Sequence, residues 1–145
     1  MRFWDPSALV PALIAEPASP TVRRSLAEDR SLVAWWGTSV ECMAAIARAV
    51  REGRLGPNEL ADALRESTTW RAEWSEVGPT TPLRTLAERL LRTHPLRSGD
   101  ALQLAAAITA SEGSPLTLPF VTRDQRLAEA ATLEGFPVIR LHLSV

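Results

Sequence analysis

The sequence predicts an α/β domain built around a mainly parallel sheet. Short apolar stretches of extended character alternate along the chain with longer segments of helical periodicity, a pattern typical of consecutive βα units. A length of 145 residues, with 46% hydrophobic and 23% charged residues, fits one compact domain with a substantial core. No internal repeat or low-complexity segment interrupts the pattern. We therefore predict a single domain that spans residues 1–145.

The first half of the chain carries two expected strands and four expected helices. In order they are a strand at 2–5, helices at 7–16 and 20–28, a strand at 32–36, and helices at 39–52 and 57–71. Pro11 makes the first turn of its helix irregular, whereas Pro20 and Pro57 stand at helix starts, where proline is tolerated. Gly37 ends the bulky apolar second strand, and Gly53 ends the helix that follows it. The apolar positions that recur at helical spacing in this helix are Val40, Met43, Ala44, Ala47 and Val50.

The second half continues the alternation. Its expected elements are a strand at 74–77, a helix at 82–92, a further helix that contains residues 101–108 and has Asp100 in its first turn, a strand at 119–122, a helix at 125–133 and a strand at 138–141. The helix at 82–92 is amphipathic. Seven of the eight residues at 101–108 are apolar, which indicates a helix buried on nearly all sides. Gly135 closes the last helix.

Composition excludes several classes of protein. The net charge of -1 and a pI of about 6.1 argue against a broadly basic nucleic-acid-binding domain, so any such site must be local or shared across a dimer. Cys42 is the only cysteine, so no intrachain disulfide can form. No apolar run approaches the roughly 20 residues of a membrane span, and Asp5 and Pro6 interrupt any signal-peptide pattern. We expect a cytoplasmic protein with no membrane contact.

Four acidic residues fall at corresponding places on this predicted map. Asp5 ends the first strand and Asp124 follows the fourth, while Glu41 and Asp100 lie in the first turns of two helices. In a parallel sheet, the carboxyl ends of the strands and the starts of the following helices share one edge, where such folds bind ligands. The four carboxylates can therefore converge on one crevice.

Such a cluster has a chemical purpose. Carboxylates packed together repel one another, and a divalent cation relieves that repulsion. Mg²⁺ and Mn²⁺ prefer oxygen ligands, usually a few carboxylates together with water and substrate phosphate. A cation held this way can activate water and stabilise the leaving oxygen of a phosphodiester. The sequence favours metal-assisted phosphodiester hydrolysis.

Each acid also has a structural alternative. Thr38 and Glu41 fit a capping box with Thr38 as the cap, an arrangement that contributes about 1 kcal/mol. Asp100 can favour the dipole of its helix, and Asp124 can cap the helix that begins at residue 125. Asp5, between Trp4 and a proline at the end of a core strand, is the hardest to explain structurally.

Four segments together resemble the PIN domain, with the closest likeness to the VapC-like toxins of toxin–antitoxin pairs. They are residues 4–10, 39–41, 94–107 and 120–124. The Asp-Ala-Leu-x-Leu-Ala-Ala-Ala stretch that starts at Asp100 is the most specific piece, and the segments follow one another in the family order over nearly the whole chain.

This resemblance implies a three-layer α/β/α sandwich whose acidic cluster binds Mg²⁺ or Mn²⁺ and cuts RNA. Asp5, Glu41, Asp100 and Asp124 match the acidic positions of the family, as catalytic residues and metal ligands. Ser7 and Thr122 match small hydroxyl residues near the metal. The resemblance also implies a homodimer and a small antitoxin protein whose tail blocks the crevice. Relatives often carry a further acid where this chain has Gln125 and Arg126, which leaves one or two metal ions open.

Other residues and functional classes fit the sequence less specifically. Arg97 and Arg123 flank site acids and can contact RNA phosphate, neutralise the cluster or remain solvated. His94 and His142 stand in no metal-ligand spacing.

A haloacid-dehalogenase-like phosphatase would need a second Asp where Ser7 stands, and a response-regulator receiver would need a lysine, which the chain lacks. The remaining alternative is an inactive PIN-like scaffold that binds RNA or a protein partner.

Overall fold

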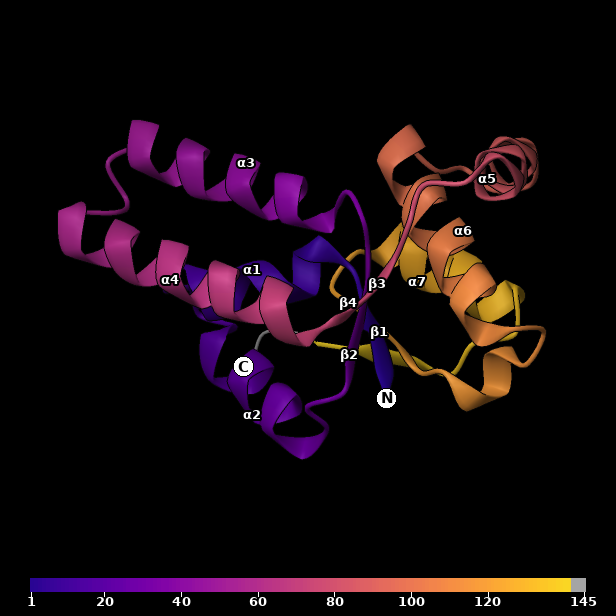
Figure 1. The fold of residues 1–145 in the computed structure, drawn as a ribbon, viewed down its shortest axis with the longest axis horizontal. Coiled ribbons are helices and arrows are strands. Elements are labelled where there is room, and N and C mark those ends of the chain that lie inside the picture. Colours follow the sequence, from indigo (N-terminus) through magenta and orange to yellow (C-terminus); the bar gives the residue numbers. More distant parts are fainter. Residues whose placement is uncertain (142–145) are drawn as a thin grey trace.

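The computed structural model describes residues 1–141, which form five strands, seven α-helices and one short 3-10 helix (Figure 1). The elements in chain order are β1 (Arg2–Trp4), α1 (Pro6–Leu13), α2 (Ser19–Glu28), β2 (Leu32–Trp35), α3 (Thr38–Arg51), α4 (Pro57–Glu73), β3 (Ser75–Val77), α5 (Thr81–Thr93), α6 (Ser98–Ser111), η1 (Pro115–Thr117), β4 (Phe120–Thr122), α7 (Gln125–Leu133) and β5 (Val138–Arg140). His142 lies outside the described residues. In the part of the chain so described, no helix is both long and apolar enough to cross a membrane.

The five strands form one sheet in the order β3-β2-β1-β4-β5, and every neighbouring pair is parallel. Phe3 in β1 lies opposite Val33 of β2 on one side and opposite Phe120 of β4 on the other. The chain first builds the sheet outward from β1 to β3 and then returns to the other side of β1 to add β4. The carboxyl ends of β1 and β4 therefore border the point where the strand order reverses, the usual place for a ligand in such sheets.

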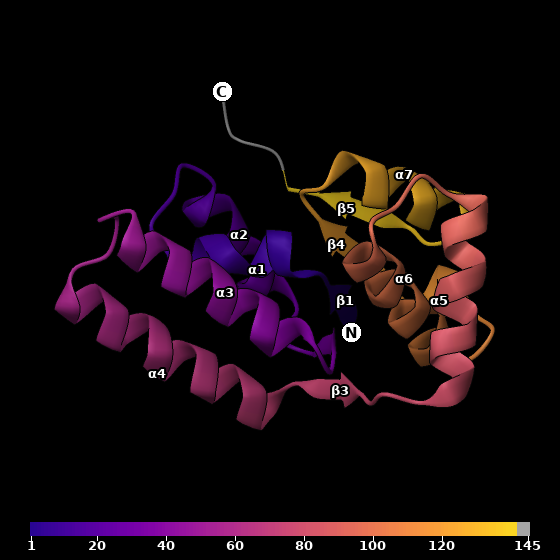
Figure 2. The same ribbon diagram turned by 90° about the horizontal axis from the view of Figure 1, so that it is seen from above.

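Two helical layers enclose the sheet, because successive side chains in a strand point to opposite faces. Phe3 and Phe120 stack at 5.2 Å between ring centroids and pack with residues of α5, α6 and α7. Trp4 and Val121, the next residues along, pack with α1, α2, α3 and α4. The two layers lie on either side of the sheet in both views (Figures 1 and 2). The predicted three-layer α/β/α sandwich is confirmed.

Most predicted elements are found with shifts of one or two residues at their ends, and α7 has the predicted bounds. Two predictions were less accurate. The first helix ends at Leu13, three residues early, because Ile14 is extended and Pro17 disfavours helical backbone just before it. The 3-10 turn η1 was not predicted.

His94 caps the end of α5 and is buried, with its Nε2 2.8 Å from Glu134 Oε2 near the end of α7.

The helix α3 presents a different face to the core than its apolar pattern suggests. Its buried positions are Thr38, Cys42, Ile46 and Ala49. The apolar residues Val40, Met43 and Val50 are instead exposed, at 68%, 42% and 39% of their surfaces. Trp36, immediately before α3, is also exposed. The helix is therefore apolar on its outer side as well as its inner side.

Candidate active site

Two of the four predicted acids lie at the point where the strand order reverses. Asp5 directly follows β1, and Asp124 lies two residues beyond β4. Each is also the N-cap of the next helix: Asp5 Oδ2 accepts a hydrogen bond from the Ser7 amide at 3.2 Å, and Asp124 Oδ1 accepts one from the Leu127 amide at 2.9 Å. The capping alternative for Asp124 is thus observed. One oxygen of its carboxylate does the capping, so this role does not exclude a ligand.

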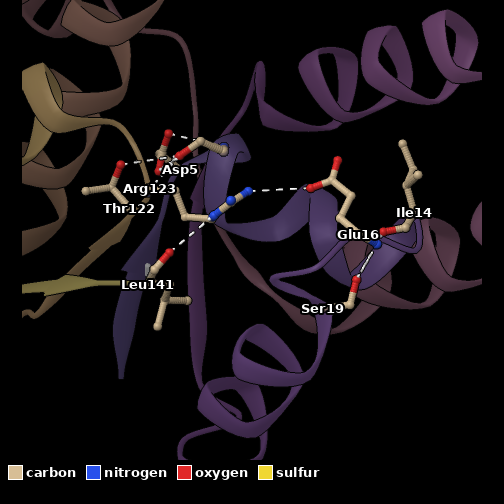
Figure 3. Close-up of polar contacts among 8 residues, drawn as sticks. Asp5, Ile14, Glu16, Ser19, Thr122, Arg123 and Leu141 are labelled. Atoms are coloured by element: carbon tan, nitrogen blue, oxygen red, sulfur yellow. Dashed lines mark hydrogen bonds and ion pairs between the residues drawn. The ribbon is translucent and has the colours of Figure 1, made fainter. Parts of the chain in front are cut away.

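The hydroxyl groups of Ser7 and Thr122 link the turn after β1 to the turn after β4. Ser7 Oγ donates to Asp5 Oδ1 at 3.0 Å and lies 3.4 Å from Thr122 Oγ1. The amides of Arg123 and Asp124 donate to Ser7 Oγ and Thr122 Oγ1, each at 3.0 Å. Figure 3 shows Asp5, Thr122 and Arg123 at this junction. The network fixes the orientation of the Asp5 carboxylate.

Glu41 and Asp100 approach from the two helical layers. The capping-box interpretation of Glu41 is wrong, because Gly37 caps α3 and Thr38 already lies inside the helix with no cap hydrogen bond. Glu41 Oε1 instead accepts a hydrogen bond from Gln103 Nε2 at 3.0 Å. Asp100 lies in the first turn of α6, as predicted, and its carboxylate is close enough to repel Glu41.

The Asp5 carboxyl group is held in an unfavourable setting for a charge. Only 3% of the residue is exposed, and this burial raises its pKa from 3.8 to about 7. Hydrogen bonds from Thr122 and Ser7 act in the opposite direction and lower that pKa, and the charge of Asp124 raises it further. The neutral acid and the carboxylate of Asp5 are therefore comparable in population near neutral pH.

The other acids also influence one another electrostatically. Partial burial raises the pKa of Glu41, and the charge of Asp100 adds to that effect against the Gln103 hydrogen bond. Partial burial likewise raises the pKa of Asp100, together with the charge of Asp124. The backbone amide of Arg97 and the nearby cations Arg97 and Arg126 lower it.

The donor set fits a hard divalent cation. Within residues 1–141, none of the four carboxylates forms an ion pair with an arginine, a histidine or the N-terminus, and Arg97 and Arg126 act on Asp100 only from beyond ion-pair distance. In the same residues, no three His, Cys, Asp or Glu side chains stand close enough to ligate one ion together. Mg²⁺ commonly takes one or two carboxylates and fills its other positions with water, so the charge and donor type suit it.

The arginines predicted near the site differ in their contacts. Arg97 is exposed at the start of α6, beside Asp100. The Arg123 guanidinium points away from the acids, where Nε donates to the Leu141 carbonyl at 3.2 Å and Nη1 lies 3.5 Å from Glu16 Oε2 (Figure 3). A phosphate contact by either residue remains a prediction, and for Arg123 it would compete with these bonds.

Two further features lie outside the acidic crevice. Cys42 is buried, and its burial raises the pKa of the thiol to about 12, so this cysteine behaves as an inert core residue. A separate groove of about 280 Å³ lies between α1, α2 and α4, where Trp70 and Trp74 are among the lining residues. None of the four acids lines that groove.

The buried amide of Gln103 is the site residue that sequence reasoning missed. It lies one turn beyond Asp100 on α6, only 1% exposed, and bonds both Thr38 and Glu41. The only sequence signal was a single amide within a run of Ala and Leu.

Known proteins resemble the chain in sequence and in fold. It is 32% identical to a curated protein named ribonuclease VapC45 of Mycobacterium tuberculosis, over 92% of this chain and 90% of that protein. A solved toxin–antitoxin complex from Klebsiella pneumoniae matches with a TM-score of 0.66 and 14% identity, covering 99% of this chain and all of that chain. FitAcB from Neisseria gonorrhoeae matches with a TM-score of 0.66 and 15% identity over 97% of each chain. A scan against models of protein families finds no match.

Proposed function

Since this chain belongs to the VapC ribonuclease family, we propose that it is a Mg²⁺- or Mn²⁺-dependent endoribonuclease and the toxin of a toxin–antitoxin pair. One observation carries the proposal: Asp5 and Asp124 meet at the reversal of the strand order, with Glu41 and Asp100 beside them. Ordinary packing does not account for acids that gather at one edge of the sheet and raise one another's pKa. A cation and an RNA phosphate account for them.

Asp5, Glu41, Asp100 and Asp124 would hold the cation between them. Because no three of these side chains within residues 1–141 stand close enough to ligate one ion together, one or two would bind it directly and the others through its bound water. When bound, such an ion supplies a Lewis acid that activates water and stabilises the leaving oxygen of the phosphodiester. Ser7 and Thr122 would keep the Asp5 carboxylate aimed into the crevice through the hydrogen bonds already described. The carboxylate of Asp124 would be oriented by its own capping bond, in which Oδ1 accepts from the Leu127 amide and Oδ2 stays free for the cation.

The partners follow from the same proposal. RNA is the substrate, and a small antitoxin protein is the inhibitor, consistent with the toxin–antitoxin complex among the solved structures of similar fold. The cytoplasm, where RNA and antitoxin would meet the enzyme, is its expected location.

We also propose that a second copy of the chain covers the outer side of α3, to give a homodimer. Val40, Met43 and Val50 lie along this side of the helix, with Trp36 before it, and all four are exposed. Contiguous exposed apolar residues of this kind mark interaction surfaces.

Cleavage of a mixed RNA pool by the purified protein tests the main proposal. Mn²⁺ or Mg²⁺ supports cleavage, and EDTA abolishes it. Asp124→Asn also abolishes cleavage yet leaves the helix capped, because asparagine caps as well as aspartate. Asp62→Asn, at an exposed position of α4, is the matched control and keeps full activity.

The alternative function, an inactive scaffold, gives a different result. It predicts no cleavage and no Mn²⁺ binding at millimolar concentration, although RNA or protein binding persists. Cleavage that survives in Asp124→Asn or in EDTA would refute the carboxylate–metal proposal.

A further inference from the structure

Gln103 is a polar side chain within a run of apolar residues in α6. It is 1% exposed, and the neighbouring buried positions of α6 are Ala101, Leu104 and Ala105. A buried amide is costly unless its donors and acceptor are satisfied. An apolar residue would be the ordinary choice in this position of α6. The partners of the amide therefore indicate why it is there.

All of those partners belong to α3, in the opposite helical layer. Gln103 Nε2 donates to Thr38 Oγ1 and to Glu41 Oε1, each at 3.0 Å. The Thr38 hydroxyl, itself fully buried, lies 3.4 Å from Gln103 Oε1. The reverse orientation of the amide would turn Oε1 toward the Glu41 carboxylate, so only the donor orientation is compatible with that neighbour. The amide thus spans the two layers just beyond the carboxyl end of β2.

Glu41 needs such a partner to stay in the crevice. Its residue is exposed, and Asp100 repels its carboxylate. Among the hydrogen bonds of the described residues, the bond from Gln103 is the one that holds the Glu41 side chain. Gln103 and Asp100 are three residues apart on α6 and share a face of that helix. One helix face therefore presents both the acid that repels Glu41 and the amide that retains it.

We propose that Gln103 is a positioning residue that holds the Glu41 carboxylate beside Asp100 in readiness for a divalent cation. The proposal rests on the metal-dependent function proposed above. Residues that orient metal ligands typically change metal affinity by about 10- to 100-fold when they are replaced.

Mn²⁺ binding to the purified 145-residue protein tests this role of Gln103. Calorimetry, or the electron paramagnetic resonance signal of free Mn²⁺, measures the affinity. Gln103→Met keeps the length of the side chain and removes both donors, and we expect its Mn²⁺ affinity to fall about tenfold or more. Thr38→Val is the matched control, since it breaks the other interlayer bond of the same amide and leaves the Glu41 bond intact. We expect this control to stay within about twofold of the wild type. Thermal unfolding establishes that each variant is folded, and Gln103→Asn replaces Gln103→Met in the same assay if the latter does not fold.

Two results would overturn the proposal: unchanged affinity in Gln103→Met, or an equal loss in Thr38→Val, which would assign the effect to helix packing. A metal-free measurement separates this failure from failure of the proposed function. In EDTA, the shift of the urea midpoint caused by Gln103→Met is expected to be smaller in a Glu41→Ala background than in the wild type. Equal shifts would show that Gln103 does not hold Glu41. Absence of Mn²⁺ binding by the wild type, together with unequal shifts, would instead refute the metal-dependent function alone.

Discussion

Asp5 links stability to pH in the metal-free protein. Burial raises its pKa from 3.8 to about 7, so between these values the folded protein keeps a proton that the unfolded chain loses. The resulting stability is fully present below pH 3.8 and is lost as pH rises through about 7. From pH 5.5 to pH 8 this group alone lowers the free energy of unfolding by about 2 kcal/mol.

Asp5→Asn is expected to remove most of that dependence and to be more stable than the wild type at pH 8. The amide keeps both contacts, since its Oδ1 can accept from the Ser7 amide and its Nδ2 can donate to Ser7 Oγ. Urea unfolding in EDTA at pH 5.5 and pH 8 measures the effect, with Asp62→Asn as the exposed control. A pH dependence in Asp5→Asn equal to that of the wild type would contradict this account.

The site acids could be predicted one by one because each follows a strand or begins a helix, and such positions are visible in sequence. The partners of Gln103 could not, since they lie 62 and 65 positions away and only the packed layers bring them together. Thr38 illustrates the converse error. Its spacing to Glu41 matches a capping box, yet α3 begins at Thr38 itself, and one residue of shift removes the box.

The helix α3 was predicted correctly as an element, but its most regular apolar stripe is not the one that packs in the core. Periodicity identifies an apolar stripe without identifying what covers it, and α3 has two such stripes. The helices α1 and α4 pack on α3, whose stripe with Cys42 and Ile46 is buried in the core, whereas Met43 and Val50 remain exposed. An outward apolar stripe is a property of the element that only an assembly explains.

Met43→Arg is therefore expected to weaken the proposed homodimer, because a second copy would have to bury an unpaired charge. We expect a dissociation constant at least tenfold higher, measured by size-exclusion chromatography with light scattering over a concentration series. Leu133→Arg, at an exposed apolar position of α7, is the control and should leave the oligomeric state unchanged. A wild type that is monomeric at all concentrations would reject the dimer, and an unchanged dimer in Met43→Arg would reject this surface.

At the scale of the whole molecule, the alternation of strands and helices predicted the layers and the parallel sheet, but not the strand order. That order depends on pairing between distant segments, which local patterns do not encode. It is nevertheless decisive for the site, because the pairing of β1 with β4 brings Asp5 next to Asp124. The sequence could predict that the acids share an edge of the sheet, and the topology determines which acids are neighbours.

The overall charge of -1 sets how the protein can hold RNA. Because acidic residues outnumber basic ones, we expect binding to depend on few phosphate contacts. Each contact to a single strand contributes about 0.7 to the slope of log affinity against log salt concentration. Arg97 is exposed beside Asp100 and is the best placed for one contact. Arg97→Ala should therefore lower kcat/KM for RNA cleavage and reduce its salt slope by about 0.7. A KCl series measures both kcat/KM and its salt slope.

Arg51→Ala, at the distant end of α3, is the control in this series. Arg123→Ala in the same series decides whether an arginine already bonded to Glu16 and Leu141 also contacts phosphate. A salt slope in Arg97→Ala equal to that of the wild type would mean that Arg97 acts on Asp100 and not on the RNA.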